Sequence, residues 1–299
     1  MNNPLSERVR KVKPSATIAI SSKAMEMRSA GIDVISMSAG EPDFDTPQYI
    51  KDAAKAAIDS GMTKYTQVDG VPDLKEAIIN KFKNDNELVY QPENILVSTG
   101  AKQTLYNLFQ AILGVGDEVI IISPYWVSYT DMVLLADATP KFVDTFQEDD
   151  FSIDLEAFSD ALNERTKLVI INSPSNPTGI SFTRSDYESI GGILKNYPSV
   201  YIATDDMYEY IYWGEESFVS FAQACPSLFD RTITINGVSK AYAMTGWRIG
   251  YCGGPSDVIG AMKKVQSQST SNPSSISQAA TISALNSSKD EVYNMVQEY

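Results

Sequence analysis

The chain has 299 residues, of which 43% are hydrophobic and 21% are charged, a composition typical of a globular protein with a sizeable buried core. Asp and Glu total 38 against 24 for Lys and Arg, and the formal net charge of -14 disfavours nucleic acid and anionic membranes as partners. The sequence contains no histidine, which excludes Ser-His-Asp and Cys-His catalysis, HExxH zinc sites and imidazole general bases.

The cysteines and the N-terminal segment indicate the compartment. Cys225 and Cys252 have no metal-ligand spacing and provide no disulfide framework, which fits a reducing environment. The N-terminus lacks the apolar core of a signal peptide, and no apolar run in the sequence is long enough to span a bilayer. We therefore expect a cytoplasmic protein.

A helix and a series of short strands are predicted first along the chain. The helix is expected over residues 46–61, with Thr46 as N-cap, Pro47 in the first helical position and Gly61 as the left-handed residue that ends it. Apolar runs typical of strands covered on both faces follow, namely NILVS (94–98), EVIIIS (118–123), KLVIIN (167–172), VYIAT (200–204), TITIN (232–236) and IGYCG (249–253).

Helices are expected between these strands. One begins near Gly100, with the spacing of a single buried face at Leu105, Leu108, Phe109 and Ile112. Residues 287–299 predict a final helix without a C-cap, and the Pro- and Asp-rich segment 41–47 is expected to connect an N-terminal arm to the main domain. This pattern predicts an α/β fold with a mainly parallel sheet.

Lys240 is the first candidate for chemistry. It follows Ser239 in VSKAYAMTGWRIGY (238–251), and partial desolvation near a strand end would lower its pKa, so that its neutral amine could form a Schiff base. Ser239 and Arg248 offer a hydroxyl and a five-donor fork suited to a phosphate, and pyridoxal 5′-phosphate (PLP) requires a lysine beside a phosphate site. Alternatively, Lys240 is a surface lysine and Arg248 a structural ion-pair partner.

Two further segments carry candidate ligand contacts. Gly100, in STGAKQT (98–104), would open a helix whose free N–H groups attract an anion, although such a glycine is also common in plain turns. Asp205 follows an apolar strand and could keep a pyridine nitrogen protonated. The alternatives are a solvated loop acid or an Asp205 and Asp206 pair on Mg²⁺.

Asn176 and Trp126 are weaker candidates. Asn176 belongs to NSPSNPTG (172–179), a turn-rich segment after a strand, where its amide could donate to a ligand oxygen. Trp126 follows the strand EVIIIS and could stack on a flat ring or simply pack in the core.

Seven segments carry a resemblance when they are taken in order, namely AGEPDFDTP (39–47), KYTQVDGVPDLKEAI (64–78), STGAKQTLYNLFQAIL (98–113), SPYWVSY (123–129), NSPSNPTG (172–179), DDMYE (205–209) and SKAYAMTGWRIGY (239–251). Together they resemble the class I PLP-dependent aminotransferases, and most closely the bacterial aspartate aminotransferases. The resemblance implies PLP-dependent transferase fold type I. Its large domain would cover residues 46–285, between an N-terminal arm and small-domain segment (1–45) and a helix leading to the rest of the small domain (286–299).

The resemblance also implies roles for the residues that react with or tune the cofactor. Lys240 corresponds to the lysine that holds PLP as a Schiff base and then moves the substrate proton. Asp205 corresponds to the partner of the pyridinium nitrogen. Tyr208 and Asn176 correspond to the groups that hydrogen-bond the phenolic oxygen of PLP and thereby tune the pKa of the Schiff base.

The remaining implied contacts surround the phosphate and the substrate. The phosphate would be held by Arg248, Ser239 and the backbone of Gly100, Ala101 and Lys102. Tyr65 corresponds to a tyrosine that reaches the phosphate of the other subunit, which implies a homodimer. Trp126 corresponds to the stacking residue, and Gly40 to a backbone contact near the substrate α-carboxylate.

Substrate choice is implied by a smaller set, in which Lys102, Ser15 and Thr17 would contact a distal carboxylate. The implied reaction is transfer of an amino group between aspartate or glutamate and oxaloacetate or 2-oxoglutarate by a ping-pong mechanism, without a metal. Alternatives within the fold are a prephenate or aromatic aminotransferase and a PLP β-lyase.

Members of this group continue for about 100 further residues, which include an arginine for the α-carboxylate. We therefore expect that this chain is a fragment that binds PLP but transaminates poorly. The alternative of another class is a non-catalytic PLP-binding regulatory protein.

Overall fold

The computed structural model describes residues 4–38 and 40–299, which contain one seven-stranded mixed sheet. Its order is β1-β7-β6-β5-β4-β2-β3. The strands are β1 (Ile95–Ser98), β2 (Glu118–Ser123), β3 (Thr139–Asp144), β4 (Thr166–Asn172), β5 (Tyr201–Asp205), β6 (Thr232–Gly237) and β7 (Gly250–Gly253). β7 runs antiparallel to β1 and β6, and the other neighbouring strands are parallel. The predicted α/β fold with a mainly parallel sheet is confirmed.

Helices precede, separate and follow the strands. The α-helices are α1 (Glu7–Lys11), α2 (Ala16–Ser29), α3 (Gln48–Asp59), α4 (Pro72–Asn86), α5 (Ala101–Ile112), α6 (Ser128–Leu135), α7 (Leu155–Ala161), α8 (Arg184–Leu194), α9 (Phe221–Ala224), α10 (Ser256–Ser267), α11 (Ser275–Asn286) and α12 (Asp290–Glu298). Short 3-10 helices are η1 (Pro92–Asn94), η2 (Gln147–Asp149), η3 (Pro226–Arg231) and η4 (Thr245–Trp247).

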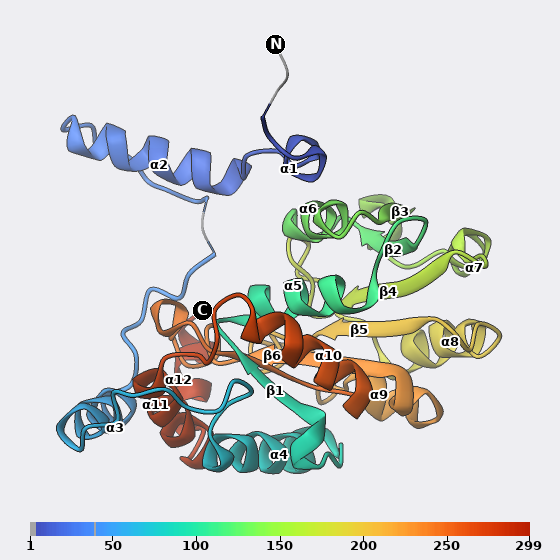
Figure 1. Cartoon of the computed structure of the whole chain (residues 1–299). Coiled ribbons are helices and arrows are strands. Elements are labelled where there is room, and N and C mark those ends of the chain that lie inside the picture. Colours follow the sequence, from blue (N-terminus) through green and yellow to red (C-terminus); the bar gives the residue numbers. More distant parts are fainter. Residues whose placement is uncertain (1–3, 39) are drawn as a thin grey trace.

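Helices cover both faces of the sheet (Figure 1). On one face, α5, α6 and α10 bury Leu108, Val133 and Met262 against strand residues such as Ile121 and Ile233. The other face is covered by α7, α8 and α9 beside β2, β4 and β5, and by α3, α4, α11 and α12 beside β1 and β7. The central strands are buried on both faces, which explains why their sequences are continuous apolar runs.

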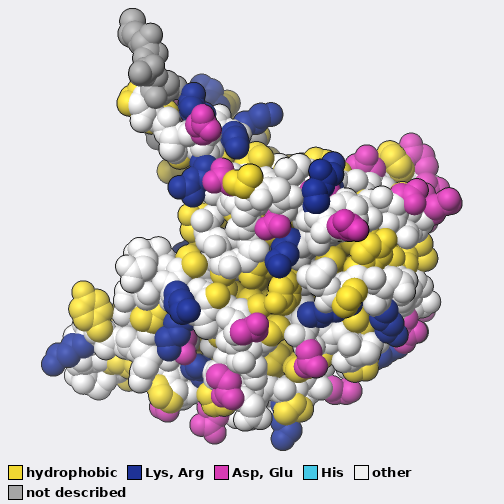
Figure 2. Space-filling view, turned by 45° about the vertical axis from the view of Figure 1, so that its right-hand side comes forward, with side chains coloured by type: hydrophobic (Ala, Val, Ile, Leu, Met, Phe, Trp, Pro, Cys, Tyr) yellow, Lys and Arg dark blue, Asp and Glu magenta, His cyan; other side chains and the backbone are white. Residues whose placement is uncertain are grey.

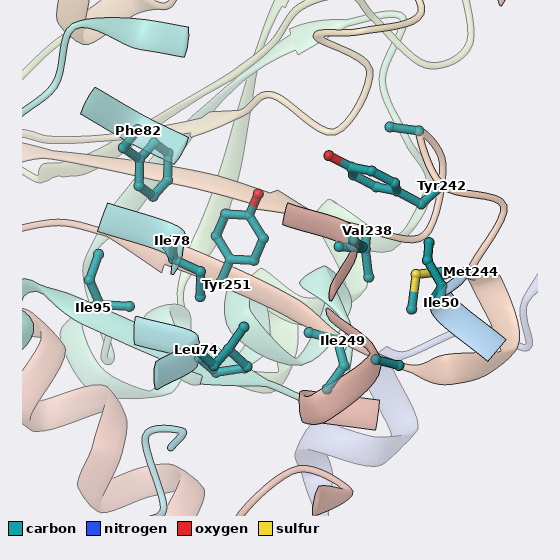
Figure 3. Packing of buried hydrophobic residues seen from close by; sticks show 14 of the residues in the cluster. Ile50, Leu74, Ile78, Phe82, Ile95, Val238, Tyr242, Met244, Ile249 and Tyr251 are labelled. Carbon is teal, nitrogen blue, oxygen red and sulfur yellow. The ribbon is translucent and has the colours of Figure 1, made fainter. Parts of the chain in front are cut away.

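Figure 3 shows the core beneath α4. Leu74, Ile78 and Phe82 of this helix lie beside Ile95 of β1 and Tyr251 of β7, and all five side chains are buried. Apolar side chains at this helical spacing form one stripe, which fixes α4 on the sheet. Lys81 and Asp85, discussed below, lie on the same side of α4 near its C-terminal end.

Two local predictions need correction. β3 was not among the predicted strands, because as an edge strand it buries only Val143 and lacks a continuous apolar run. Thr46 was predicted as the N-cap of the first helix and Pro47 as its first helical residue, but α3 begins at Gln48, with Pro47 in the cap position and no side-chain cap. The Thr46 hydroxyl instead donates to the carbonyl of Ala243 at 2.6 Å, so it joins two distant segments of the chain and does not cap the helix.

Other local predictions are confirmed. Gly61 takes a left-handed conformation, with φ of 78°, just after α3. α5 begins directly after Gly100 and buries Leu105, Leu108 and Phe109, and α12 forms within the predicted final segment.

Residues 4–38 form an arm set apart from the sheet layers (Figure 1). Arg8 and Lys11 of α1 form ion pairs with Asp137, beyond the end of α6, at 3.7 and 3.8 Å. Segment 41–47, which contains no helix or strand, joins the arm to α3 as expected. The division of the chain into domains at residues 45 and 285 stays a prediction.

One face of the molecule mixes both signs of charge. On the face drawn in Figure 2, acidic and basic side chains are interspersed with hydrophobic ones. Among residues 4–38 and 40–299, every helix is too short or too polar for a transmembrane span.

Gly250 supplies a stability prediction. It lies in β7, where an added Cβ would overlap the backbone of Gly100 and Ala101 at the start of α5. We expect Gly250→Ala to lower the free energy of unfolding by about 1–3 kcal/mol or more, because a backbone segment cannot move aside as a flexible side chain can. Urea unfolding followed by tryptophan fluorescence measures this.

Gly260→Ala is the matched control. Gly260 lies within α10, and an added Cβ there meets no atom within 4 Å among the described residues. Alanine should raise the free energy of unfolding by up to about 1 kcal/mol through its helix propensity. Equal effects of the two substitutions would contradict the close approach at Gly250.

Candidate functional site

A pocket lies at the carboxyl edge of the sheet. β2, β4, β5 and β6 are parallel, and β1 runs in the same direction because β1 and β6 are both antiparallel to β7. The segments after these strands therefore meet at one edge, where ligand sites of open α/β sheets lie. Predicted site residues that line this pocket are Thr17, Gly40, Ala101, Lys102, Trp126, Asn176, Asp205, Tyr208, Ser239, Lys240 and Arg248.

Lys240 is half-buried and follows β6. Its Nζ donates a hydrogen bond to the carbonyl oxygen of Gly40 and lies 6.0 Å from the centre of the Tyr208 ring. Burial lowers the pKa of Lys240, the carboxylate of Glu41 opposes this effect, and the guanidinium of Arg248 adds to it. The side chain is therefore the partly desolvated lysine that the sequence predicts.

Asp205 ends β5 and is buried. Its Oδ2 accepts a hydrogen bond from the Tyr129 hydroxyl at 2.7 Å, whereas Oδ1 has no hydrogen-bond partner within the described part of the chain. Asn172 donates its side-chain amide to the backbone carbonyl of Asp205 at 2.7 Å and so ties the ends of β4 and β5 together. Burial raises the pKa of Asp205 to about 6, although the hydrogen bond from Tyr129 and the charge of Lys240 lower it.

Tyr208 and Asn176 approach each other from the loops after β5 and β4. Burial and the neighbouring Asp205 raise the pKa of Tyr208, and a hydrogen bond with Asn176 partly opposes them. The phenol therefore stays protonated near neutral pH and can donate. The backbone N–H of Asn176 is bonded to Oδ1 of Asn172 at 2.8 Å, which holds the loop in place.

A candidate anion site lies where α5 begins. The first N–H groups of a helix lack intrahelical partners, and the helix dipole adds positive potential there. Arg248 packs its guanidinium so closely against Gly100 that an added Cβ would overlap it, and its Nη1 donates to the carbonyl of Thr245 at 2.8 Å. Ser239 is buried at the same pocket, so a hydroxyl, a guanidinium and a helix start are brought together.

Trp126 and Lys102 form the wall beside this anion site. The Nζ of Lys102 lies 4.8 Å from the centre of the Trp126 ring, within cation–π range. Desolvation and the charge of Arg248 lower the pKa of Lys102. Trp126 packs edge-on against Tyr129, with ring centres 5.3 Å apart, which fixes its indole at the pocket.

The arm contributes unevenly to the pocket. Gly40 and Thr17 line it, whereas Ser15 does not, and the Ser15 hydroxyl accepts a hydrogen bond from the backbone N–H of Ile18 at the start of α2. Tyr65 is 92% exposed and also lies outside the pocket lining. The structure therefore does not bring Ser15 and Tyr65 together with the other predicted site residues of the same chain.

Sequence reasoning missed Tyr129 and Glu41. Tyr129 lies one helical turn beyond Trp126 within SPYWVSY, so its position beside a strand end was the available signal. Glu41 lines the pocket and accepts a hydrogen bond from the Thr245 hydroxyl. Its electrostatic effect on Lys240 could be recognised only once the fold had brought these two distant parts of the sequence together.

The residues present fit PLP. The unpaired Oδ1 of Asp205 can accept a hydrogen bond from a protonated pyridine nitrogen, which would relieve a penalty of about 1–3 kcal/mol for a buried unsatisfied acceptor. Lys240 provides an amine in the same pocket, and the start of α5 with Arg248 provides an anion site. By contrast, no group of three or more Cys, Asp or Glu residues in the described ranges could hold a metal ion.

Comparison with known proteins gives the family. A family model described as aminotransferase class I and II matches residues 32–299. The chain is 51% identical over 295 residues to the aspartate/prephenate aminotransferase of Nitrosomonas europaea, covering 99% of this chain and 74% of that relative. It is 55% identical over 281 residues to the corresponding enzyme of Cereibacter sphaeroides, covering 94% and 70%.

Solved structures agree with the sequence relatives. The aspartate aminotransferase from Rhizobium meliloti matches with a TM-score of 0.95 at 46% identity, covering 99% of this chain and 74% of that chain. The aspartate aminotransferase from Thermus thermophilus with maleate matches with a TM-score of 0.93 at 44% identity, covering 99% and 76%. The family model, these relatives and the pocket geometry agree, and the chain belongs to the class I and II aminotransferase family.

Proposed function

We propose that this aminotransferase moves an amino group between aspartate or glutamate and a 2-oxo acid in two half-reactions, with Lys240 as the amine that holds PLP and as the proton carrier. Class I aminotransferases use PLP as their cofactor. The observation that carries the proposal is that a desolvated lysine and a buried carboxyl group with an unpaired oxygen line one pocket.

PLP, when bound, supplies an electron sink that stabilises negative charge at the substrate α-carbon. Asp205 would accept a hydrogen bond from the pyridine nitrogen and keep it protonated, and Trp126 would stack on the ring. Tyr208 and Asn176 would donate to the phenolic oxygen. Ser239, Arg248 and the start of α5 would hold the phosphate.

The lowered pKa of Lys240 supports its proposed role. A lysine with the ordinary pKa of 10.5 is almost fully protonated at pH 7 and cannot accept a proton. Burial and Arg248 shift this balance toward the neutral amine. The neutral amine can accept the proton from the α-carbon of a substrate held in the pocket and return it to a neighbouring atom.

The positive charge in the pocket supports a substrate that carries a second carboxylate. Lys102 and Arg248 both line it, and we assign Lys102 to the distal carboxylate, with Thr17 in the same lining and a backbone contact of Gly40 near the substrate α-carboxylate. Prephenate is the second candidate acceptor, because it also carries two carboxylates and because relatives at 51–55% identity are described as aspartate/prephenate aminotransferases.

A homodimer is also part of the proposal. Tyr65 is 92% exposed, yet its loop is held firmly, since Gln278 donates to the Thr66 hydroxyl at 3.0 Å and Ser275 donates to the carbonyl of Met62 at 2.6 Å. A rigid loop that presents an exposed tyrosine suits a contact with the phosphate site of a second copy. We keep residues 46–285 as the PLP-binding domain and Ser15 as a weaker substrate candidate.

The Lys240 assignment is tested by visible absorption. Purified chain mixed with PLP should show a visible band, which aspartate should convert to the shorter-wavelength absorption of the aminated cofactor. Lys240→Ala should abolish the band, because no other described lysine lines the pocket except Lys102. Lys264→Ala, an exposed lysine of α10, should leave the band unchanged. A band that survives Lys240→Ala would contradict the assignment.

Asp205 gives a pH-dependent prediction for the cofactor-free chain. Its folded pKa of about 6 lies above the ordinary 3.8, so between these pH values the folded chain keeps a proton that the unfolded chain releases. Stability therefore falls as the pH rises through this window, by about 3 kcal/mol in total. Asp205→Asn should consequently unfold less readily than the parent at pH 7.5, with an advantage that shrinks as the pH falls toward 4.

The same substitution should have the opposite effect on cofactor affinity. At pH 7.5, Asp205→Asn should weaken PLP binding about tenfold or more, because the ionised carboxylate is lost as partner of the pyridine nitrogen. Urea unfolding and a PLP titration measure the two effects. Asp206→Asn, a neighbouring buried acid outside the pocket lining, is the affinity control. Equal PLP affinities of Asp205→Asn and the parent would overturn the role of Asp205.

Lys102 is tested with maleate, a dicarboxylate without an amino group. In the PLP-loaded chain, Lys102→Ala should raise the dissociation constant of maleate by about 10-fold to 100-fold, because a charge-assisted hydrogen bond contributes about 1.5–3 kcal/mol. Binding of propionate, which has one carboxylate, should change much less. If both ligands weaken equally, Lys102 does not read the distal carboxylate.

A further inference from the structure

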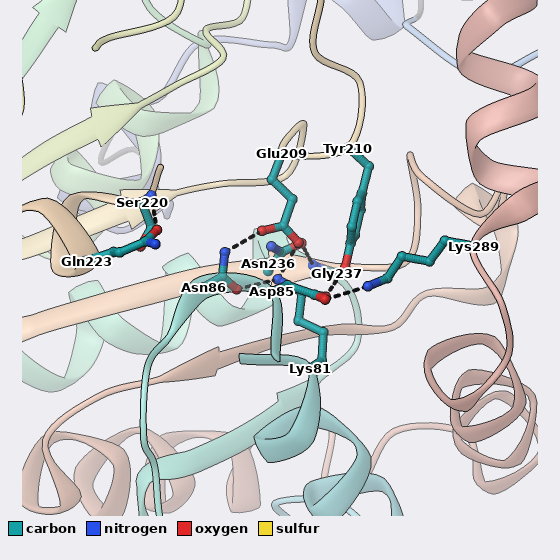
Figure 4. Close-up of polar contacts among 10 residues, drawn as sticks. All are labelled: Lys81, Asp85, Asn86, Glu209, Tyr210, Ser220, Gln223, Asn236, Gly237 and Lys289. Carbon is teal, nitrogen blue, oxygen red and sulfur yellow. Dashed lines mark hydrogen bonds and ion pairs between the residues drawn. The ribbon is translucent and has the colours of Figure 1, made fainter. Parts of the chain in front are cut away.

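A cluster of buried polar side chains lies next to the turn after β5, and none of its members lines the pocket (Figure 4). Lys81 of α4 forms an ion pair with Glu209, and the two side chains are only 2% and 3% exposed. Asn86 completes the group, since it accepts a hydrogen bond from Lys81 Nζ at 2.7 Å and donates to Glu209 Oε2 at 2.9 Å. Both charges are thus fully enclosed and mutually bonded.

The same turn carries Tyr208 into the pocket. Tyr208 lines the pocket, while the next residue, Glu209, is directed to Lys81. The backbone is closed locally by hydrogen bonds from Glu209 N–H to the Asp206 carbonyl at 3.1 Å and from Ile211 N–H to the Tyr208 carbonyl at 2.8 Å. Any shift of Glu209 therefore moves the backbone that holds Tyr208.

A second anchor follows directly. The hydroxyl of Tyr210 donates to Asp85 of α4, and Lys289, at the start of α12, forms an ion pair with the same carboxylate. Lys81 Nζ lies 5.5 Å and Lys289 Nζ lies 5.2 Å from the centre of the Tyr210 ring. Two consecutive residues of the turn are thus tied to α4, and one of them also to α12 (Figure 4).

Asp206 completes the set of ionisable groups that face Lys81. Burial and the charge of Glu209 raise the pKa of Asp206, whereas the charge of Lys81 lowers it, and the ion pair of Lys81 is with Glu209. A buried ion pair contributes little net stability compared with apolar residues of similar size, whereas removing one partner is strongly destabilising because it leaves a single buried charge. The pair is therefore better explained by the geometry it imposes than by stability.

We propose that the buried Lys81–Glu209 ion pair, bridged by Asn86, is a positioning device that holds the 206–211 turn so that Tyr208 meets the cofactor. Lys81 and Glu209 touch neither PLP nor substrate and act only through Tyr208. The inference rests on the role of Tyr208 in the proposed function.

The test uses variants that remove both charges without leaving one buried alone. Lys81→Met with Glu209→Gln keeps side-chain volume, and the new amide can still accept from Asn86. In the PLP-loaded chain, the pH midpoint of the visible band reports the proton on the Lys240 nitrogen. Tyr208→Phe should raise this midpoint by about one unit, because the phenolic oxygen, freed of a donor, holds that proton more strongly.

The paired variant should raise the midpoint in the same direction, by about half a unit, and should add nothing further in the Tyr208→Phe background. In the cofactor-free chain, backbone amides of residues 206–211 should exchange hydrogen at least about tenfold faster. Lys81→Arg with Glu209 unchanged keeps both charges. Its band midpoint and its amide exchange should therefore lie closer to those of the parent than those of the paired variant do. The matched control is Lys75→Met with Asp69→Asn, a part-buried pair that joins the first turn of α4 to the segment before this helix, where Asp69 also pairs with Lys263 of α10.

The outcomes separate the two proposals. If Tyr208→Phe leaves the midpoint unchanged, the proposed role of Tyr208 fails and the positioning inference fails with it. If Tyr208→Phe shifts the midpoint but the paired variant does not, or if their effects add, the positioning inference alone is overturned. Should the paired variant not fold, Asn86→Ala removes the bridge and leaves both charges paired, and unchanged amide exchange in that variant would equally overturn the inference.

Discussion

The parallel register of β4, β5 and β6 is the constraint on which the site depends. Asn172 is paired with Asp205, and Asp205 with Ile235, so the three strands end almost level. Side chains after each strand then project over the same edge of the sheet. A slip of one residue would turn Asp205 to the opposite face of the sheet and separate it from Tyr129, so register and site geometry are inseparable.

Charge is distributed differently in the pocket and on the whole chain. The chain carries a formal charge of -14, yet three of the basic side chains, Lys102, Lys240 and Arg248, line one pocket with Asp205 and Glu41 as its acids. Mutual repulsion contributes to the lowered pKa values of Lys102 and Lys240. Such a pocket favours ligands with several negative charges, and a phosphate-bearing cofactor with a dicarboxylic substrate meets this condition.

Much of the fold and of the site could be predicted from the sequence, for identifiable reasons. The central strands are apolar along their whole length because both faces are covered, and this pattern is visible without a structure. β3 escaped prediction because an edge strand needs no such pattern. Lys240, Asp205, Asn176, Tyr208 and Arg248 lie in short segments whose order resembles a known family, and the structure brings all five to one pocket.

Partnerships between distant segments could not be predicted in the same way. Tyr129 donates to Asp205 across 76 positions, and Asn86 donates to Glu209 across 123. A single sequence records neither pair, because each residue taken alone is unremarkable for a helix or a turn. Asp205 and Asp206 are the clearest example of this limit. Both acids are buried and adjacent in the sequence, but only Asp205 lines the pocket.

Asp205 and Glu209 are both buried acids, but the chain stabilises them differently. Both carboxyl groups are buried, and an isolated buried charge is unfavourable. Glu209 forms an ion pair with Lys81 of the same chain, which holds its side chain in place without a ligand. Asp205 lacks a full set of partners within the described chain, so its stabilisation depends on a ligand. The chain thus pairs one buried acid, Glu209, and leaves one oxygen of the other, Asp205, without a partner. This arrangement lowers the stability of the ligand-free chain but strengthens ligand binding, which is the balance expected of a fold that binds a cofactor.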